Sequence, residues 1–555
     1  MIPAESRPGG FESAGQATIE RLDQTAMSLN YKRLIQFVLL FSAALTASSA
    51  FATTYYVDYS SGNDSNGGTS KSSPWQHAPG MGGCTANCAN ANPGPGDSII
   101  LKGGVTWPNS AFGWIFRWSG SSGNTLYIGV DHSWFAGSSW NRPVFNGGGA
   151  SVAGSNDSLL DFSTFNSPSP SYLVVDNIEF TGLYWPANSG GSYIRVGNGQ
   201  NIEIKNMYFH GWSHAAGVDY GWAITGDAHI PNVNSGSSFH DSICDGSDTD
   251  EHSMGCVYGS PPVIYNNVMR QMSNGMIVNG AQSVHDNLVE YINQSVGTEH
   301  ENGFEDNGSE GLDFYNNVIR HTSTSNGLTL WFAPVKGYAV NIWNNVVYDT
   351  TDGNVVDFAP SVQGVNGGCP GGTSGDYCAT SGTFNLYNNT IECGPDGNPT
   401  DPCGVAYSGA DGFNLRNNHF ITSFSDAIQN CTSSNNCSMA GNLIQTQSVA
   451  NNLGYSSGET YAFSPVTAAV GAGTDLTAQI GSLVNGLSSL GLTAPSASLD
   501  TSYACNSNST TKTVSCPVRT SVTRAAGSWN VGAYQFGSAS ASQPQPPTGL
   551  AASVN

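Results

Sequence analysis

Charged residues are scarce in this chain, and basic residues are the scarcest of all. Of the 555 residues, 17 are Lys or Arg and 40 are Asp or Glu, which gives a formal net charge of −23 at pH 7. Such a surface repels nucleic acid and anionic membranes, so both are excluded as partners. An acidic polymer is disfavoured unless a cation intervenes, whereas a neutral ligand meets no such penalty.

Long apolar runs are also missing. The run Leu34–Thr46 follows Lys32 and Arg33 and is too short to span a bilayer. It leads to Ala50-Phe51-Ala52, which has the small-x-small form of a leader cleavage site. We therefore expect residues 1–52 to be an upstream segment plus a secretory signal peptide. The expected location is extracellular, at the cell surface or in the periplasm, without membrane insertion.

Helix-period amphipathic stretches are absent beyond that leader. Gly is abundant at 68 residues, and hydrophobic residues still make up 39% of the chain. This composition excludes a disordered protein and favours a turn-rich, all-β fold.

One short phrase recurs along the chain: an aromatic or aliphatic residue, a polar residue, Asn, and a hydrophobic run. Its Asn positions are Asn177, Asn206, Asn267, Asn287, Asn317, Asn345, Asn389, Asn418 and, more weakly, Asn442, with Asp241 in place of Asn in one copy. Spacings in the twenties predict a solenoid, and the β-branched and aromatic runs predict strands. Asn can cap a bend and pair with Asn one coil away, so we expect an Asn ladder inside a turn.

The twelve cysteines fall in couples that are close in sequence. These couples are Cys84/Cys88, Cys244/Cys256, Cys369/Cys378, Cys393/Cys403, Cys431/Cys437 and Cys505/Cys516. In an exported protein they predict local disulfides. Zinc is the weaker alternative, because the spacings are irregular and no paired His ligands accompany them.

Both ends of the solenoid resemble secreted proteins of the pectate-lyase-like superfamily. The resemblance lies in Tyr55–Asp58, in Pro95–Gly104 with its Pro-Gly-Asp-Ser-Ile phrase, and in the closing segment Gly527–Phe536. It implies a right-handed parallel β-helix over residues 53–537, with an N-terminal cap at 53–110 and core coils at about 170–445. Residues 538–555 read as a Ser/Pro-rich linker, in which Pro546–Leu550 resembles the start of a fibronectin type III module.

The superfamily pattern implies which strands form the floor of the substrate cleft. In it, the post-Asn strand is followed by a variable loop and then by the floor strand. Here the corresponding segments are Gly255–Tyr258, Gly275–Asn279, Gly303–Asn307, Gly327–Trp331 and Asn354–Phe358. We therefore expect these five segments to lie side by side.

A Glu-His pair precedes the Gly of two of these segments, which we predict to be two coils apart. The pairs are Glu251-His252 and Glu299-His300. Parallel strands stack at about 4.8 Å, so the pairs are expected about 10 Å apart. This separation is compatible with the two carboxylates of an inverting glycosidase. The predicted catalytic set is Glu251, His252, Glu299, His300, Glu301, Glu305 and Asp306.

Acidic oxygens in turns can instead hold a calcium ion. The candidate Ca²⁺ ligands are Asp248, Asp250, Glu301 and Asp306. A solvated acidic loop is the third interpretation of the same residues. Aromatic faces suit sugar rings, although aromatics also fill solenoid cores. The predicted substrate contacts are Trp331, Tyr258, Trp222, Trp212, Asn279, Arg320 and Lys336.

Two floor segments, Asn302–Glu305 and Ser325–Trp331, resemble the acidic strands of family 9 pectate lyases. Those lyases bind calcium through aspartates and use a floor-strand lysine as base. This chain has Asn326 and Thr329 where acids are expected, and its next floor strand lacks a lysine. The departure weakens the lyase interpretation, for which Lys336 or Arg320 would have to act as base.

The sequence therefore predicts an exported polysaccharide-binding β-helix that cleaves glycosidic bonds by carboxylate and His chemistry. One alternative is a calcium-assisted lyase acting by β-elimination. The other is a non-catalytic adhesin or structural protein of the cell wall or extracellular matrix.

Overall fold

The computed structural model divides the chain into two compact units, Met1–Ala52 and Thr53–Asn555. It describes residues 52–152, 158–162, 169–197, 199–218, 221–226, 236–247, 255–259, 261–278, 282–292, 302–322, 329–334, 336–350, 355–359, 361–363, 377–379, 382–393, 402–424, 426–452, 473–476, 505–516, 529 and 531–533. The predicted leader lies outside these residues except for its last residue, Ala52.

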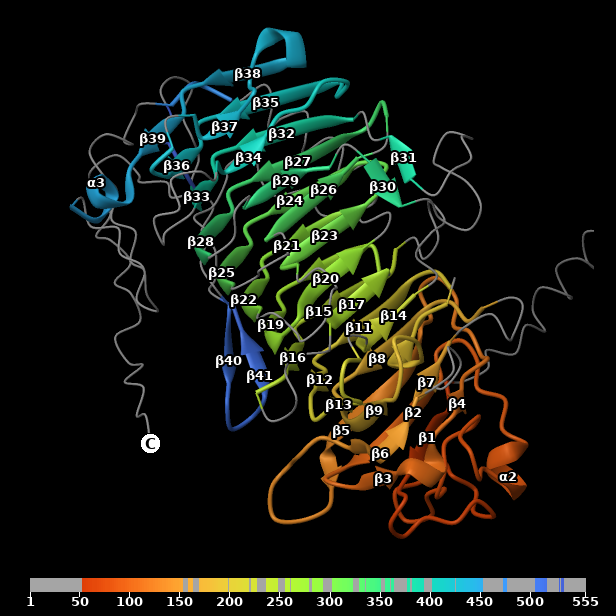
Figure 1. Ribbon diagram of the computed structural model, residues 1–555. Helices are drawn as coiled ribbons and strands as arrows, with labels where there is room; N and C mark the ends of the chain where they lie inside the picture. The colour runs from red at the N-terminus through yellow and green to blue at the C-terminus, as the bar shows by residue number, and fades with distance from the viewer. Residues whose placement is uncertain are drawn as a thin grey trace, which may run out of the picture. The chain divides into compact units, whose positions relative to one another are not determined.

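The second unit is a right-handed parallel β-helix, as the sequence predicts (Figure 1). Three long parallel sheets run along it, and each strand pairs with its counterparts in the neighbouring coils.

Sheet A consists of β1 (Thr54–Val57), β2 (Ser98–Gly103), β5 (Leu126–Phe135), β8 (Leu173–Asp176), β11 (Ile202–Lys205), β15 (Ser238–His240), β18 (Val263–Tyr265), β21 (Ser283–His285), β24 (Leu312–Tyr315), β27 (Ala339–Trp343), β32 (Thr383–Tyr387), β35 (Gly412–Arg416) and β38 (Cys437–Ala440). Sheet B consists of β3 (Thr106–Pro108), β6 (Val144–Ser151), β9 (Glu179–Trp185), β12 (Tyr208–Phe209), β16 (Ile243–Asp245), β19 (Val268–Met272), β22 (Leu288–Ile292), β25 (Val318–Thr322), β28 (Val346–Thr350), β33 (Thr390–Glu392), β36 (His419–Ile421) and β39 (Leu443–Gln445), with β13 (Ser213–His214) beside β9.

Sheet C consists of β4 (Trp114–Ile115), β7 (Leu160–Asp161), β10 (Ser192–Arg195), β14 (Trp222–Thr225), β17 (Gly255–Gly259), β20 (Asn274–Val278), β23 (Phe304–Asn307), β26 (Leu330–Ala333) and β29 (Val356–Phe358). Three small pairs complete the strands: β30 (Ser361–Gln363) with β31 (Tyr377–Ala379), β34 (Gly404–Val405) with β37 (Ile428–Gln429), and β40 (Asn506–Asn508) with β41 (Thr513–Ser515). The short helices are α2 (Ala86–Ala89), α3 (Gln447–Asn452) and the 3-10 turns η1 (Asn109–Ala111) and η2 (Ser433–Asn435). No helix in this described part is long and apolar enough to cross a membrane.

A ladder of buried Asn side chains lies at the corner between sheets A and B. Asn267, Asn287, Asn317, Asn345 and Asn389 each donate an Nδ2 hydrogen to the Oδ1 of the Asn in the next coil, at 2.9–3.2 Å. The ladder continues through Asn418 to Asn442, at 3.0 Å. Because these amides satisfy one another inside the corner, they hold successive coils in register.

The ladder begins three coils later than the sequence pattern predicts. Strand register aligns Ile178, Met207 and Ser242 with Asn267. Asn177, Asn206 and Asp241 instead occupy the preceding position, where φ is +51° to +65°. The first coils therefore use Asn or Asp for its tolerance of left-handed backbone and not for the ladder.

Local disulfides clip the coils as predicted. Five of the six couples are bonded: Cys84–Cys88, Cys244–Cys256, Cys393–Cys403, Cys431–Cys437 and Cys505–Cys516. The couple Cys369/Cys378 is not covered, since Cys369 lies outside the described residues.

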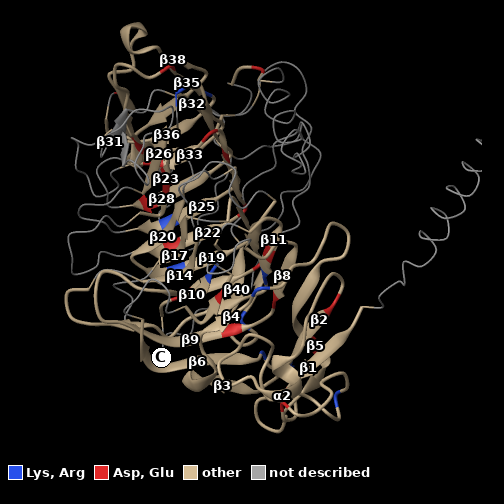
Figure 2. Cartoon of the chain, turned by 90° about the vertical axis from the view of Figure 1, so that its right-hand side faces the viewer, with Lys and Arg blue, Asp and Glu red and all other residues tan. Residues whose placement is uncertain are grey.

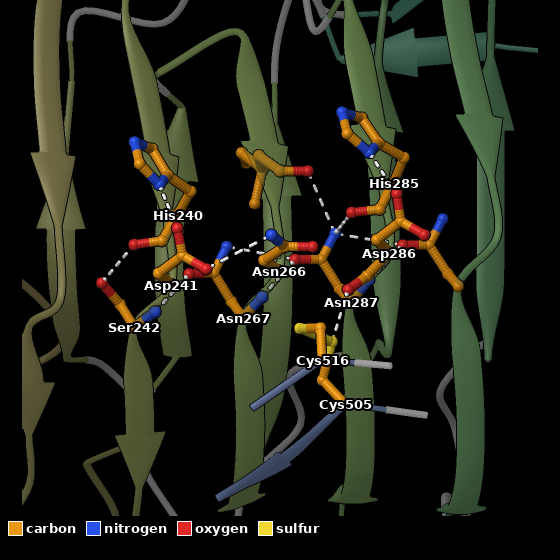
Figure 3. The surroundings of a disulfide bond; sticks show 12 residues. His240, Asp241, Ser242, Asn266, Asn267, His285, Asp286, Asn287, Cys505 and Cys516 are labelled. Atoms are coloured by element: carbon orange, nitrogen blue, oxygen red, sulfur yellow. Dashed lines mark hydrogen bonds and ion pairs between the residues drawn. A yellow bond between two sulfur atoms is a disulfide. The ribbon is translucent and has the colours of Figure 1, made fainter. Parts of the chain in front are cut away.

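The hairpin of β40 and β41 packs against the outside of sheet B (Figures 1 and 3). Arg142 donates from Nη1 to the Thr511 carbonyl at 3.0 Å, and the Lys512 ammonium lies 5.1 Å from the Tyr208 ring centroid. Together with Cys505, residues of this C-terminal region bury an apolar row that runs along sheet B: Tyr208, Ile243, Val268, Leu288, Val318 and Val346.

Candidate functional site

Sheet C carries the candidate site, because its strands align the five predicted floor segments in the predicted order. β17, β20, β23, β26 and β29 are consecutive neighbours in this sheet. Their register places Tyr258 beside Ile277, Ile277 beside Glu305, Glu305 beside Trp331, and Trp331 beside Asp357. We call these five residues the floor row.

The floor row points away from the core. The residues that immediately precede it, Val257, Met276, Phe304, Leu330 and Val356, are all fully buried. Side chains alternate between the two faces of a strand, so the floor row takes the outer face, where each member is half-buried. A flat row of this kind, repeated every strand, suits an extended polymer.

Alignment of the floor segments by their Gly residues is wrong for the first and the fourth of them. Gly255 pairs with Asn274 and not with Gly275, whereas Gly275 and Gly303 are in register. In the fourth segment, Leu330 pairs with Phe304, which puts Thr329 and not Gly327 level with Gly303. As a result, Tyr258 and Glu305 share a row, which the alignment by Gly would have separated.

The carboxylate of Glu305 is held by amide groups on both sides. Asn307 donates from Nδ2 to Oε1 at 2.5 Å, and Asn302 donates from Nδ2 to Oε2. Asn302 is itself fully buried, and its backbone N–H donates to the Asn274 Oδ1 at 3.0 Å. The carboxylate is therefore oriented by the fold, and two oxygens that accept hydrogen bonds suit a proton acceptor better than a proton donor.

Asp357 is a second carboxylate in the same row, two strands away from Glu305. Trp331 lies between them, half-buried, and packs against Ala333 and Ala359. Two strand spacings correspond to about 10 Å. Inverting glycosidases hold their two carboxyl groups roughly 6.5–9.5 Å apart. The row thus presents an aromatic surface flanked by two acids at a separation close to that range.

Tyr258, the first residue of the floor row, packs against an aromatic ring of the preceding strand, although the row itself continues there with Thr225. The rings of Tyr258 and Trp222 lie 5.0 Å apart, although Trp222 itself is only 5% exposed. Trp222 lies over Gly255, where a Cβ would come within 1.9 Å of the indole. Gly255 therefore makes room for the ring that supports Tyr258.

Several predicted site residues lie away from the floor row. Asp306 points into the core, is 0% exposed and accepts a hydrogen bond from Ser309 Oγ at 2.7 Å. Its burial raises its pKa to about 7 in spite of those hydrogen bonds. Trp212 is a core residue at 1% exposure. Neither side chain is placed to touch a polymer on the outer face.

The two candidate bases are also displaced from the floor row. Arg320 belongs to β25 of sheet B, where its Nη2 lies 2.6 Å from Glu290 and its Nη1 donates to the Tyr348 hydroxyl at 3.1 Å. Burial alone would lower the pKa of Arg320, but Tyr348 and Glu290 raise it above its ordinary value. This guanidinium stays protonated. Lys336 is exposed on the turn that follows β26.

The remaining predicted residues are outside the described part of the chain. They are Glu251, His252, Glu299, His300, Glu301 and Asn279, together with Asp248 and Asp250 of the calcium set. Glu251 and His252 fall between β16 and β17, and Glu299 to Glu301 fall between β22 and β23. The strands that flank the first segment are two coils away from those that flank the second.

The predicted calcium site stays a prediction, since Asp248, Asp250 and Glu301 lie outside the described residues. No group of three His, Cys, Asp or Glu side chains among the described residues is arranged to hold a metal ion. Asp306, the described member of the predicted set, does not fit the role, because its buried carboxylate is committed to Ser309.

Sequence reasoning missed Asp357 as a site residue. The signal was available, since Val355-Val356-Asp357-Phe358 places one acid between core-forming residues in a predicted floor strand. Figure 2 shows how sparsely charged residues are distributed along the chain, so an outward acid in a floor strand is informative.

The fold and the floor row define a parallel β-helix with an acidic and aromatic strip on one sheet. No family model matches the chain, and no curated protein matches it by sequence. Among solved structures, it is similar to a GH136 lacto-N-biosidase from Eubacterium ramulus, with 13% identity, TM-score 0.33, and coverage of 78% of this chain and 73% of that one. It is also similar to the pectate lyase Pel9A, with 13% identity, TM-score 0.40, and coverage of 88% and 98%. A rhamnogalacturonan lyase matches with 12% identity, TM-score 0.38, and coverage of 70% and 87%. These likenesses concern the fold alone.

Proposed function

We propose that this protein is an exported carbohydrate-active enzyme that binds a polysaccharide along the floor row and hydrolyses its glycosidic bonds. The observation that carries the proposal is the arrangement of Glu305 and Asp357 on either side of Trp331, on the outer face of a flat parallel sheet. A neutral polysaccharide is the expected substrate class, because the chain carries a net charge of −23.

The proposed reaction is an inverting hydrolysis. Glu305, with both oxygens oriented by amides, accepts a proton from a water molecule as that water attacks the anomeric carbon. Asp357 donates a proton to the glycosidic oxygen as the bond to the leaving sugar breaks. The products are a new reducing end and a free hydroxyl group, and the two carboxyl groups then exchange protons with solvent. Trp331 packs against the ring of the bound sugar.

Other predicted residues keep their place in this proposal as predictions. Glu251, His252, Glu299, His300 and Glu301 precede the floor strands in sequence and remain candidates to assist catalysis or to bind calcium.

The lyase alternative is disfavoured by the composition of the row. β-Elimination needs a base beside the acidic sugar. Within the described part of sheet C, the basic residue in line with the floor row is Arg195, four strands from Glu305 and thus about 19 Å away.

The test is a screen of the purified chain against xylan, mixed-linkage β-glucan, galactomannan and polygalacturonate, with and without calcium. Reducing ends and ultraviolet absorbance are followed together. We expect reducing ends without new absorbance. Glu305→Gln and Asp357→Asn should each lower kcat by about a hundredfold or more, the usual contribution of a general acid or base. Trp331→Ala should weaken binding by up to about tenfold.

Glu310→Gln is the matched control, since Glu310 is an exposed carboxylate in the same coil as Glu305 but on the turn that follows β23. It removes the same charge and should leave turnover unchanged. An unsaturated, absorbing product would establish the lyase instead. No turnover on any of the four polymers would favour the structural alternative.

A further inference from the structure

A row of amide side chains lies on the outer face of sheet A, in the C-terminal coils of the β-helix (Figure 1). Strand register aligns Asn341 of β27 with Asn385 of β32, and Asn385 with Asn414 of β35. The residues on either side of each Asn are fully buried in the core, so the three amides point outward, where each is half-buried. We call these three residues the amide row. It is separate from the buried Asn ladder at the corner between sheets A and B.

The amide row is hydrogen-bonded along its length in one direction. Asn341 donates from Nδ2 to the Asp313 Oδ1 at 2.9 Å. Asn385 donates to the Asn341 Oδ1 at 2.8 Å, and Asn414 donates to the Asn385 Oδ1 at 2.9 Å. An Asn side chain has two N–H groups and an oxygen with two lone pairs, so each amide keeps an N–H and a lone pair that no described residue uses. The face therefore offers a donor and an acceptor at every strand, about 4.8 Å apart.

The fold does not require amides at this position of sheet A. In earlier coils the same outward row holds Val174, Glu203, Ser238, Val263 and Ser283. Aliphatic, acidic and hydroxyl side chains are thus all compatible with the sheet, yet three successive coils near the C-terminal end carry amides. A ligand with regularly spaced hydroxyl groups would explain this run.

The surface beside the amide row is low and almost free of charge. Two residues earlier in the same strands, Ala339, Thr383 and Gly412 are in register with one another. Their small side chains leave the amides as the projecting groups of this face. The outward positions of β27 and β32 carry no charged residue, and Arg416 of β35 is engaged by the Ser438 Oγ at 2.8 Å. Such a face suits a neutral, hydroxyl-rich ligand.

An exposed aromatic residue lies at the edge of the same face. Tyr338 immediately precedes β27, and its carbonyl accepts the Thr383 N–H at 2.8 Å, which fixes its backbone beside β32. Its side chain is 42% exposed, and among the described residues no other Phe, Trp or Tyr is exposed to this degree. A phenol ring beside spare amide groups offers a sugar both a flat apolar surface and hydrogen-bonding partners.

We propose that Tyr338 and the amide row form a second polysaccharide-binding surface, which holds a neutral chain without cleaving it. The spare amide groups bond the hydroxyl groups of successive sugars, and the ring of Tyr338 packs against one of them. Asp313, the carboxylate at the end of the row, is only 8% exposed and accepts from Asn341, so no pair of acids faces the polymer. The surface lies on a different sheet from the floor row and does not depend on hydrolysis there.

The test compares variants of this face with a matched control in the same outward row. The double variant Asn385→Val and Asn414→Val removes two amides, and Tyr338→Ala removes the ring. Valine already occupies the equivalent position in β8 and β18, so the substitution is compatible with the strand. Ser238→Val makes the same change from polar to apolar five strands away from Asn385. Retention is measured by affinity electrophoresis in the four screened polymers, with melting temperatures and sedimentation velocity on each variant.

We expect the double variant and Tyr338→Ala each to weaken retention in a neutral polymer by about tenfold, through lost hydrogen bonds and lost ring contact respectively. Ser238→Val should be retained like the wild type. The same variants should not change retention in polygalacturonate. A loss confined to that acidic polymer would overturn the assignment of a neutral ligand.

Other results separate this inference from the proposed function. If both sheet A variants behave like Ser238→Val while Trp331→Ala is weakened, the inference fails and the proposed function stands. A lower melting temperature and weaker retention of the double variant, with no effect of Tyr338→Ala, would mark the amide row as structural and overturn the inference too. Weakening by the sheet A variants alone would uphold the inference and overturn the floor row as the binding site.

Two outcomes concern the wild-type chain. If none of the four polymers retains it, both the proposed function and this inference fail. If it also sediments as a dimer that the double variant dissociates, a second copy of the chain occupies the face instead of a polysaccharide.

Discussion

Replacing one rung of the Asn ladder is expected to be far more costly than its size suggests. Asn317 is 0% exposed and takes part in four side-chain hydrogen bonds. Its Nδ2 donates to the Val284 carbonyl at 2.9 Å and to Asn345 Oδ1 at 3.2 Å. Its Oδ1 accepts from the Asn287 backbone N–H at 3.1 Å and from Asn287 Nδ2 at 3.0 Å. Asn317→Ala removes all four.

The expected loss of stability follows from the hydrogen bonds that each partner of Asn317 keeps in the variant. Asn345 Oδ1 still accepts from the Asn317 backbone N–H, and Asn287 Nδ2 still donates to Ile264 and His285 carbonyls. The Asn287 backbone N–H has no such replacement. One orphaned buried donor costs about 1–3 kcal/mol, and the three other lost bonds add roughly 1 kcal/mol each, so we expect a loss of about 4–6 kcal/mol in the free energy of unfolding.

Asn414→Ala is the matched control, because Asn414 lies on the outer face of sheet A, half-buried, and donates one hydrogen bond to Asn385 at 2.9 Å. It should cost less than about 1 kcal/mol. Urea unfolding of the oxidised chain, followed by circular dichroism, measures both variants. A difference of less than about 1 kcal/mol between Asn317→Ala and Asn414→Ala would refute the view that the ladder holds the coils in register.

Two further predictions concern pH and the C-terminal hairpin. Burial raises the pKa of Asp306 and of Asp313 to about 7, so the folded chain holds protons that the unfolded chain has already released above pH 4. The stability of the folded chain should therefore fall as the pH rises from about 4 to 7. In thermal melts, the double variant Asp306→Asn and Asp313→Asn should show a weaker dependence of stability on pH. An unchanged dependence would contradict the raised pKa values of these two carboxyl groups. Replacing Cys505 and Cys516 by Ser should lower local stability by about 3 kcal/mol and expose the apolar row of sheet B to a hydrophobic dye. If the chain around Arg142 stayed as resistant to proteolysis as in the wild type, the hairpin would not be the cover of this row.

The sequence predicts the coil architecture well because the ladder imposes a strict local requirement. Buried amides must pair with one another, so Asn267 and its successors recur at every coil. The first coils do not follow this rule, because Ile178 and Met207 occupy the ladder position there. The Asn of each of these phrases is the preceding residue, which has a left-handed backbone. The ladder position and the left-handed position both favour Asn, but for different physical reasons.

The site was harder to predict, because its residues are set by the register of the strands and by whether each side chain points inward or outward. Glu305 and Asp306 were both placed in the site, yet neighbouring residues of a strand face opposite sides, and only Glu305 is outside. Arg320 lies near the floor segments in sequence, but the corner at His321 places it on another sheet. Long connections between sheets B and C have no periodicity from which their residues could be positioned.

The outer face of a β-helix offers a direct way to separate structural from functional residues. Inward positions must fill the core, as Phe304, Leu330 and Val356 do, and the fold places no comparable demand on the floor row. Sheet C nevertheless shows an acid, an aromatic and an acid in three successive outward positions.

Elsewhere in the sheet, Asp161 and Arg195 are direct neighbours of opposite charge, which gives them a mutual electrostatic reason to be there. The acids of the floor row are separated by Trp331 and have no such pairing with each other. The outward acids of sheet C flank an aromatic surface, which is the arrangement that the proposed binding site requires.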